Sequence, residues 1–100
     1  MPLLVALTLL HGAVRIGPIT PVCKAGVPCD KPAAHVVLTF SHGATRVRTT
    51  TDASGRYRVR LRPGTWAVRA NVGMAIKPLT FVVPRVDSAR RDFAIDTGIR

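Results

Sequence analysis

The stretch TDASGRYRVRLRPGTWAVRA, residues Thr51–Ala70, decides the fold of this chain. Between Arg56 and Arg62, apolar residues alternate with arginines, and this period of two is typical of a half-buried β-strand with one apolar and one solvated face. Turn-forming residues flank this strand at Asp52–Gly55 and Arg62–Thr65, and the alternation resumes from Trp66. The pattern predicts a three-stranded antiparallel meander.

The same alternation recurs on both sides of this stretch and predicts seven short strands in all. We expect these strands at Thr8–Ile16, Ala34–Phe40, Ala44–Thr51, Tyr57–Leu61, Trp66–Ala70, Leu79–Val83 and Phe93–Ile95. The segments between them, among them Gly17–Pro32, Asn71–Lys77 and Arg85–Arg91, are expected to be loops and turns. Such a series of short strands predicts an all-β fold, a seven-stranded antiparallel β-sandwich.

Length and composition indicate one domain with a single core. The chain has 100 residues, no Glu and few residues that favour helices, whereas Val and Thr are common. We expect residues 8–100 to form one β-sandwich domain. Residues 1–7 belong to an apolar start that is too short to span a bilayer as a helix, and we interpret them as the remnant of a signal segment.

The only two cysteines, Cys23 and Cys29, lie in a loop rich in Pro and Gly. Two cysteines so close together in a small domain favour a disulfide and an oxidising compartment. Free thiols and a metal site are the alternatives, and zinc is disfavoured because the spacing is unusual and a second pair of ligands is lacking. The loop either covers one end of the core as a stapled crossover, which we favour, or carries a functional site.

The charge balance is strongly basic, with 15 Lys and Arg residues against five acidic residues, all of them Asp. Six arginines fall on outward positions of the predicted strands: Arg46, Arg48, Arg56, Arg58, Arg60 and Arg69. We expect their guanidinium groups to crowd one sheet surface, where an anion would reduce their mutual repulsion. Three interpretations stay open: a solvated surface, contact with an anionic cell-envelope polymer or similar polyanion, and contact with nucleic acid. Nucleic acid is disfavoured because the aromatic residues that could stack on bases fall on inward positions.

A family resemblance rests on eight residues of the central stretch. The pattern T-D-x-x-G-x-Y followed by L-x-P-G-x-aromatic occurs as Thr51, Asp52, Gly55, Tyr57, Leu61, Pro63, Gly64 and Trp66. With this pattern the chain resembles the carboxypeptidase regulatory-like domain, a prealbumin-like (transthyretin-like) Greek-key sandwich. The whole chain also resembles small uncharacterised bacterial secreted proteins or lipoproteins. The resemblance implies a sandwich fold and export, and it implies no particular chemistry.

Patterns typical of catalysis are weak. Ser, His and Asp all occur, yet nothing resembles a nucleophile elbow, and Ser41 and His42 are neighbours in a predicted turn. We therefore expect neither enzymatic activity nor a cofactor, but a secreted or cell-envelope module that binds an anionic polymer or a protein partner. A carbohydrate-binding module would need Tyr57 or Trp66 exposed beside a groove, whereas strand parity turns both inward. A hydrolase would need a His close to Asp and Ser in one pocket.

Overall fold

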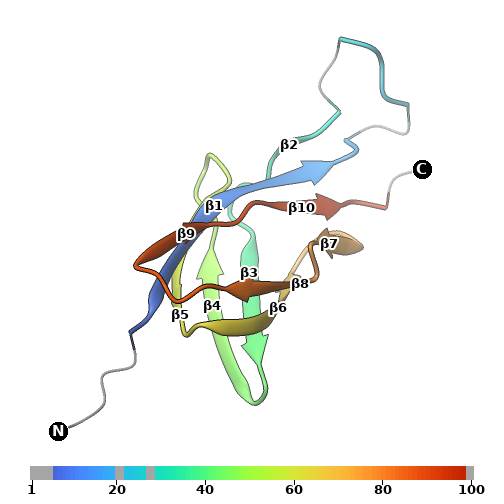
Figure 1. Ribbon diagram of the computed structural model, residues 1–100. Helices are drawn as coiled ribbons and strands as arrows, with labels where there is room; N and C mark the ends of the chain where they lie inside the picture. The colour runs from blue at the N-terminus through green and yellow to red at the C-terminus, as the bar shows by residue number, and fades with distance from the viewer. Residues whose placement is uncertain (1–5, 20–21, 27–28, 99–100) are drawn as a thin grey trace, which may run out of the picture.

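The structure is a computed structural model, and it describes residues 6–19, 22–26 and 29–98. These residues form an all-β fold of two packed sheets (Figure 1). The strands are β1 (Thr8–Gly17), β2 (Lys31–Pro32), β3 (Val37–His42), β4 (Thr45–Thr50), β5 (Arg56–Leu61), β6 (Gly64–Ala70), β7 (Ala75–Lys77), β8 (Thr80–Val83), β9 (Ser88–Arg90) and β10 (Phe93–Asp96). The expected all-β class is therefore confirmed, while the division into strands is finer than expected.

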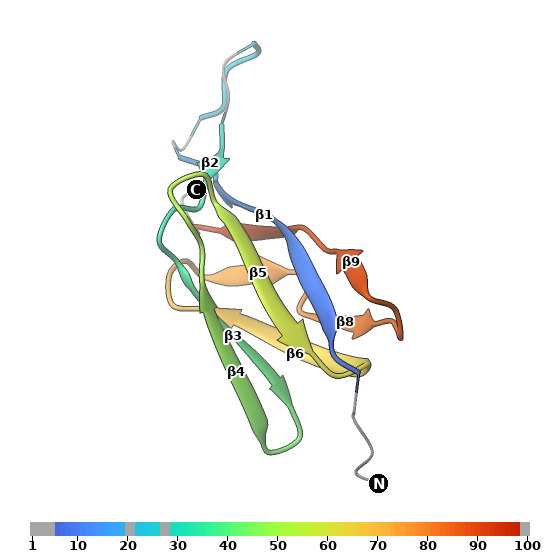
Figure 2. The same ribbon diagram turned by 90° about the vertical axis from the view of Figure 1, so that its left-hand side faces the viewer.

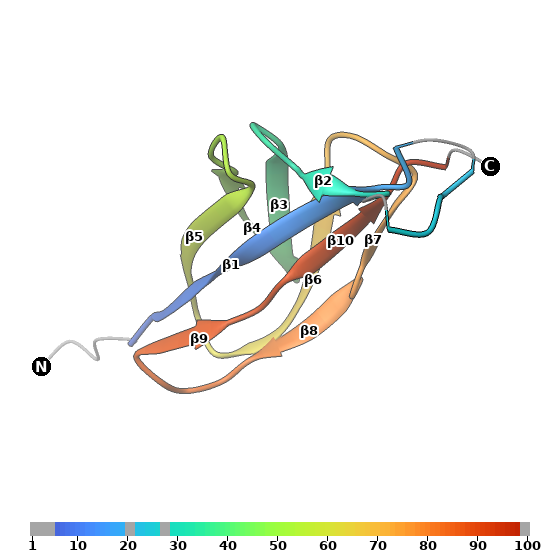
Figure 3. The same cartoon turned by 90° about the horizontal axis from the view of Figure 1, so that it is seen from above.

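Strand β1 is the central strand of the six-stranded sheet and pairs with four other strands (Figure 3). Its first half pairs with β5 on one side and β9 on the other, and its second half pairs with β2 and β10. The pairings with β9 and β10 are parallel, so the expectation of an antiparallel sandwich is wrong at this position. Strand β7 pairs antiparallel with β10 and completes the sheet.

The four-stranded sheet has the order β4-β3-β6-β8 and is antiparallel throughout (Figure 2). Its inward residues alternate with exposed ones, most clearly in β8, where Phe81 and Val83 are buried and Thr80 and Val82 are exposed. One face of this sheet therefore packs on the six-stranded sheet, and the other face is in contact with solvent.

The meander expected across Thr51–Ala70 is wrong. Strand β5 pairs with β1 in one sheet, whereas β4 and β6 both pair with β3 in the other sheet. The chain thus changes sheet at each of the two turns that the sequence indicated. Where β4 passes β5, the hydroxyl of Thr49 donates a hydrogen bond to the carbonyl of Arg58 at 3.0 Å. The alternation of residues fixes which side chains turn inward, but it does not fix which strand is the partner.

The core lies between the sheets and is centred on an aromatic cluster. The ring of Phe40, which has no exposed surface, lies about 6 Å from the rings of Tyr57, Phe81 and Phe93. Trp66 is buried as well, and its indole N–H donates to the carbonyl of Arg62. All five aromatic side chains were expected to face inward, and their burial follows directly from strand parity.

Several segments differ from the sequence-based expectation. The predicted loop Asn71–Lys77 contains β7, and the predicted charged turn Arg85–Arg91 contains β9. Leu79 was expected to begin a strand, but its side chain is exposed and the strand begins one residue later. Of the interpreted signal remnant, residues 1–5 lie outside the described part of the chain. No helix of the structure, within the described ranges, is long and apolar enough to cross a membrane.

Candidate functional site

The turn between β4 and β5 is organised by Asp52. The Asp52 carboxylate accepts hydrogen bonds from the backbone N–H groups of Ser54 and Arg56, each at 2.9 Å. The bond from Arg56 is the main reason why the pKa of Asp52 is lowered, because it stabilises the charged form. One oxygen of this carboxylate, Oδ1, therefore holds the turn through two backbone N–H groups.

Gly55 fixes this turn against β1. It has a positive φ of 77°, and a Cβ at this position would lie 2.7 Å from the carbonyl oxygen of Val14. Its own carbonyl accepts a hydrogen bond from the Val14 N–H at 2.8 Å. Only glycine fits such a close approach in this backbone conformation. The turn therefore places Arg56 and Arg58 directly beside the exposed side of β1.

Thr51 connects the same turn to the segment that precedes β3. Its buried hydroxyl donates to the carbonyl of Ala33 and accepts from the N–H of Val36. The residues Thr51, Asp52 and Gly55, which carry the family resemblance, therefore have structural roles that the hydrogen bonds explain fully.

Three basic side chains lie side by side on adjacent strands, on the outer face of the six-stranded sheet. His11 of β1 is the direct partner of Arg58 on β5 and of Arg90 on β9. Directly paired residues project on the same side of a sheet, and neighbouring strands lie about 4.8 Å apart. Arg58 and Arg90 are exposed, and Arg56 and Arg60 extend the basic row along β5.

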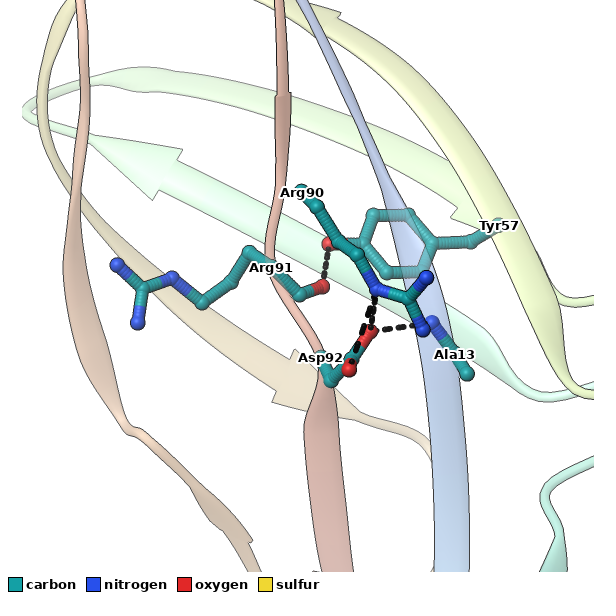
Figure 4. Close-up of polar contacts among 5 residues, drawn as sticks. All are labelled: Ala13, Tyr57, Arg90, Arg91 and Asp92. Carbon is teal, nitrogen blue, oxygen red and sulfur yellow. Dashed lines mark hydrogen bonds and ion pairs between the residues drawn. The ribbon is translucent and has the colours of Figure 1, made fainter.

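The position of Arg90 depends on the junction between β9 and β10 (Figure 4). The Asp92 carboxylate accepts a hydrogen bond from the Ala13 N–H at 2.9 Å and pairs with Nε of Arg90 at 3.2 Å. The bond from Ala13 contributes most to the lowered pKa of Asp92. On the other side, the Tyr57 hydroxyl donates to the carbonyl of Arg91. Burial of this phenol raises its pKa, because the phenolate would lose its hydration.

Gly12 permits this junction to approach β1. It lies opposite Tyr57, and a Cβ at Gly12 would lie only 2.2 Å from the carbonyl oxygen of Arg91. The absence of a side chain therefore brings β9 into register beside β1 and sets Arg90 next to His11.

These elements enclose a hollow of about 680 Å³ that is open to solvent. We call it the cationic hollow, because its lining includes the basic residues His11, Arg56, Arg58 and Arg90 and one acidic residue, Asp52. The hydroxyl-bearing residues Thr49 and Thr50 line the same hollow. Guanidinium groups and hydroxyls are donors suited to phosphate or sulfate oxygens, so the hollow can bind an anion.

The six arginines that the sequence singled out do not share one surface. All six are exposed, but Arg56, Arg58 and Arg60 belong to the six-stranded sheet. Arg46, Arg48 and Arg69 belong to the four-stranded sheet, so the expectation of a single crowded face is wrong. His11 and Arg90 could not be recognised from the sequence as members of the site. The segment of β9 lacks the alternation of a strand, and no pattern of neighbouring residues indicates its parallel pairing with β1.

The part of the cysteine loop that the structure describes lies beyond the end of β1 (Figure 1), and neither cysteine lines the hollow. Cys23 and Cys29 form a disulfide with a Cα–Cα distance of 5.4 Å, which confirms the expected pairing. At the base of the loop Arg15 pairs with Asp30 at 2.7 Å. The hydrogen bond from Arg15 is the main cause of the lowered pKa of Asp30.

Tyr57 and Trp66 are each only 2% exposed, so neither ring is available as a platform for a sugar.

The histidines lie on separate elements, with His11 on β1 and His42 at the end of β3. The His42 ring contacts the Trp66 ring in a tilted arrangement at 5.3 Å between ring centroids, and its Nδ1 lies 2.8 Å from the Thr65 carbonyl. Within the described ranges, no group of three or more His, Cys, Asp and Glu is placed to hold a metal ion.

No protein-family model, curated protein or solved structure matches the chain. The function is therefore inferred from the residues and the geometry of this chain alone.

Proposed function

We propose that the chain is a non-enzymatic, secreted or cell-envelope β-sandwich module that binds a phosphate-rich anionic polymer through the cationic hollow. The observation that carries this proposal is the row Arg58–His11–Arg90, three basic side chains side by side on adjacent strands. The guanidinium groups of Arg58 and Arg90 flank the imidazole of His11, and an anion bound between them would complement their positive charge.

The charges around the hollow support the same assignment. In the described part of the chain, the ion pairs join Arg15 to Asp30 and Arg90 to Asp92. Arg56 and Arg58 take no part in these pairs. Asp52 also lines the hollow, where its Oδ1 accepts two backbone N–H groups and its charge attracts Arg56. The hollow therefore offers two guanidinium groups whose donors face water, together with His11.

The proposed fold family and location agree with this function. We assign the sandwich to the prealbumin-like class of the carboxypeptidase regulatory-like domain, with β1, β3, β4, β5, β6, β8 and β10 as its seven principal strands. The other strands then count as short additions, which are two or three residues long. The disulfide supports export, because such bonds persist in oxidising compartments.

The test is binding to immobilised long-chain polyphosphate over a salt gradient. We expect R56Q/R58Q/R60Q to elute at much lower salt than the wild type. The slope of log affinity against log salt should become shallower by roughly 0.9 for each phosphate that the variant no longer neutralises. Glutamine keeps much of the stem that covers the sheet and removes the charge.

The matched control is K24Q/R62Q/R85Q, which also removes three positive charges but from exposed loop and turn positions. It should elute close to the wild type. Equal reductions in the two triple variants would show that only net charge matters, and the cationic hollow would then have no special role.

A further inference from the structure

The exposed side of the four-stranded sheet carries a second group of arginines. We propose that Arg46, Arg48 and Arg69, here called the arginine face, form a separate binding surface for the same class of phosphate polymer, so that one domain joins two polymer chains. The existence of this surface is independent of the cationic hollow, whereas the joining of two chains rests on the proposed function.

The register of the sheet brings the three arginines together. Thr39 of β3 is the direct partner of Arg48 on β4 and of Arg69 on β6. The two guanidinium groups therefore arise from positions about 10 Å apart on one side of the sheet, with a hydroxyl between them. Arg46 lies two residues before Arg48 on β4, so it projects on the same side, opposite Ser41. The resulting surface combines guanidinium and hydroxyl donors.

No acidic side chain lies on these four strands. The five acidic residues of the chain are Asp30, Asp52, Asp87, Asp92 and Asp96. Each of them belongs to the six-stranded sheet or to a connection outside β3, β4, β6 and β8. The positive charge of the arginine face is therefore not neutralised by its own strands, and it complements an extended polyanion.

The arginine face and the cationic hollow carry their arginines on different sheets, and they adjoin at β4, because Thr49 and Thr50 of β4 also line the hollow. The guanidinium groups of the hollow come from β5 and β9 of the six-stranded sheet, and those of the arginine face come from β4 and β6 of the four-stranded sheet (Figure 2). In this proposal each surface takes its own chain, and the binding stoichiometry distinguishes this arrangement from one chain that contacts both surfaces.

Two surfaces on one small domain have a measurable consequence. A bivalent protein links long polymers into a network when neither component is in large excess. We therefore expect wild-type protein mixed with long-chain polyphosphate at low salt to scatter light at intermediate ratios and to clear at both extremes. With short polyphosphate, calorimetry should give two chains bound per domain.

The variant R46Q/R48Q/R69Q should bind one short chain per domain and lose the scattering, while it keeps the melting temperature of the wild type. R56Q/R58Q/R60Q should behave in the same way because it loses the other surface. The control K24Q/R62Q/R85Q should keep both the stoichiometry and the scattering.

The two proposals fail in different ways. If R46Q/R48Q/R69Q retains two chains per domain and full scattering, the arginine face does not bind polymer and this inference is overturned. If R56Q/R58Q/R60Q retains them, the cationic hollow and hence the proposed function is wrong. A wild type that binds one chain per domain, without scattering, would show that a single polymer contacts both surfaces, and the joining of two chains would be excluded.

Discussion

The two sides of β5 show how one short strand can serve two purposes. Its inward residues Tyr57, Val59 and Leu61 are buried in the core, and its outward arginines are exposed. Tyr57 also donates a hydrogen bond to the β9–β10 junction, whereas Arg58 faces His11 across the sheet. We infer from this difference that the inner side sets the geometry of the outer side, where we propose that the polymer binds. Substitutions on the inner side and its contacts should lower stability, and substitutions on the outer side should lower binding.

The largest effect is expected from Gly12→Ala, which alters the contact between the inner side and the β9–β10 junction. The new methyl group would meet the backbone of Arg91 at 2.2 Å, and backbone cannot move aside as a flexible side chain can. We expect a loss of roughly 3 kcal/mol in the free energy of unfolding, the upper range for overpacking. Urea denaturation measures this loss.

Gly43→Ala is the control for Gly12→Ala. A Cβ at Gly43 meets nothing within 4 Å, so only its positive φ of 59° adds strain. This variant should lose about 1 kcal/mol. If Gly12→Ala proves no more costly than Gly43→Ala, the junction does not press against β1 as described.

A smaller effect is expected from Tyr57→Phe, which removes one hydroxyl and keeps the ring. The carbonyl of Arg91 would lose the hydrogen bond that it accepts from Tyr57. The free energy of unfolding should fall by about 1 kcal/mol, the usual contribution of one hydrogen bond. Because the hydroxyl also positions the segment that carries Arg90, the variant should bind polyphosphate less tightly in the folded state. If Tyr57→Phe binds polyphosphate as tightly as the wild type does, the inner side of β5 does not set the binding geometry.

A feature of the fold or of the candidate site could be predicted from the sequence when residues close together in the chain determine it. The inward direction of Tyr57 and Trp66 follows from an alternation of period two, and the structure confirms it. The disulfide likewise followed from two cysteines close together in a loop. Both signals are local, so they do not require knowledge of the partner strands.

The cationic hollow could not be predicted in the same way because it is made by long-range pairing. His11 and Arg90 become neighbours only through the parallel pairing of β1 with β9, near opposite ends of the chain. Arg90 lies in a charged segment without alternation, which is typical of a turn. The arginines of β4 and β5 are close in sequence, yet the crossover at Asp52–Gly55 sends them to different sheets. Nothing in the alternation distinguishes such a crossover from a hairpin.

The smallest effect on intrinsic stability is expected from the outer side of β5. Exposed positions away from buried contacts usually change stability by less than about 0.5 kcal/mol, and R56Q/R58Q/R60Q also relieves repulsion between like charges. Its melting temperature without ligand should therefore equal or slightly exceed that of the wild type. Saturating short polyphosphate should raise the melting temperature of the wild type, because a ligand that binds only the folded state stabilises it. The increase should be clearly smaller in the variant, which keeps only the arginine face. If the variant instead melts well below the wild type without ligand, the outer arginines contribute to the fold itself, and the separation between the two sides of β5 does not hold.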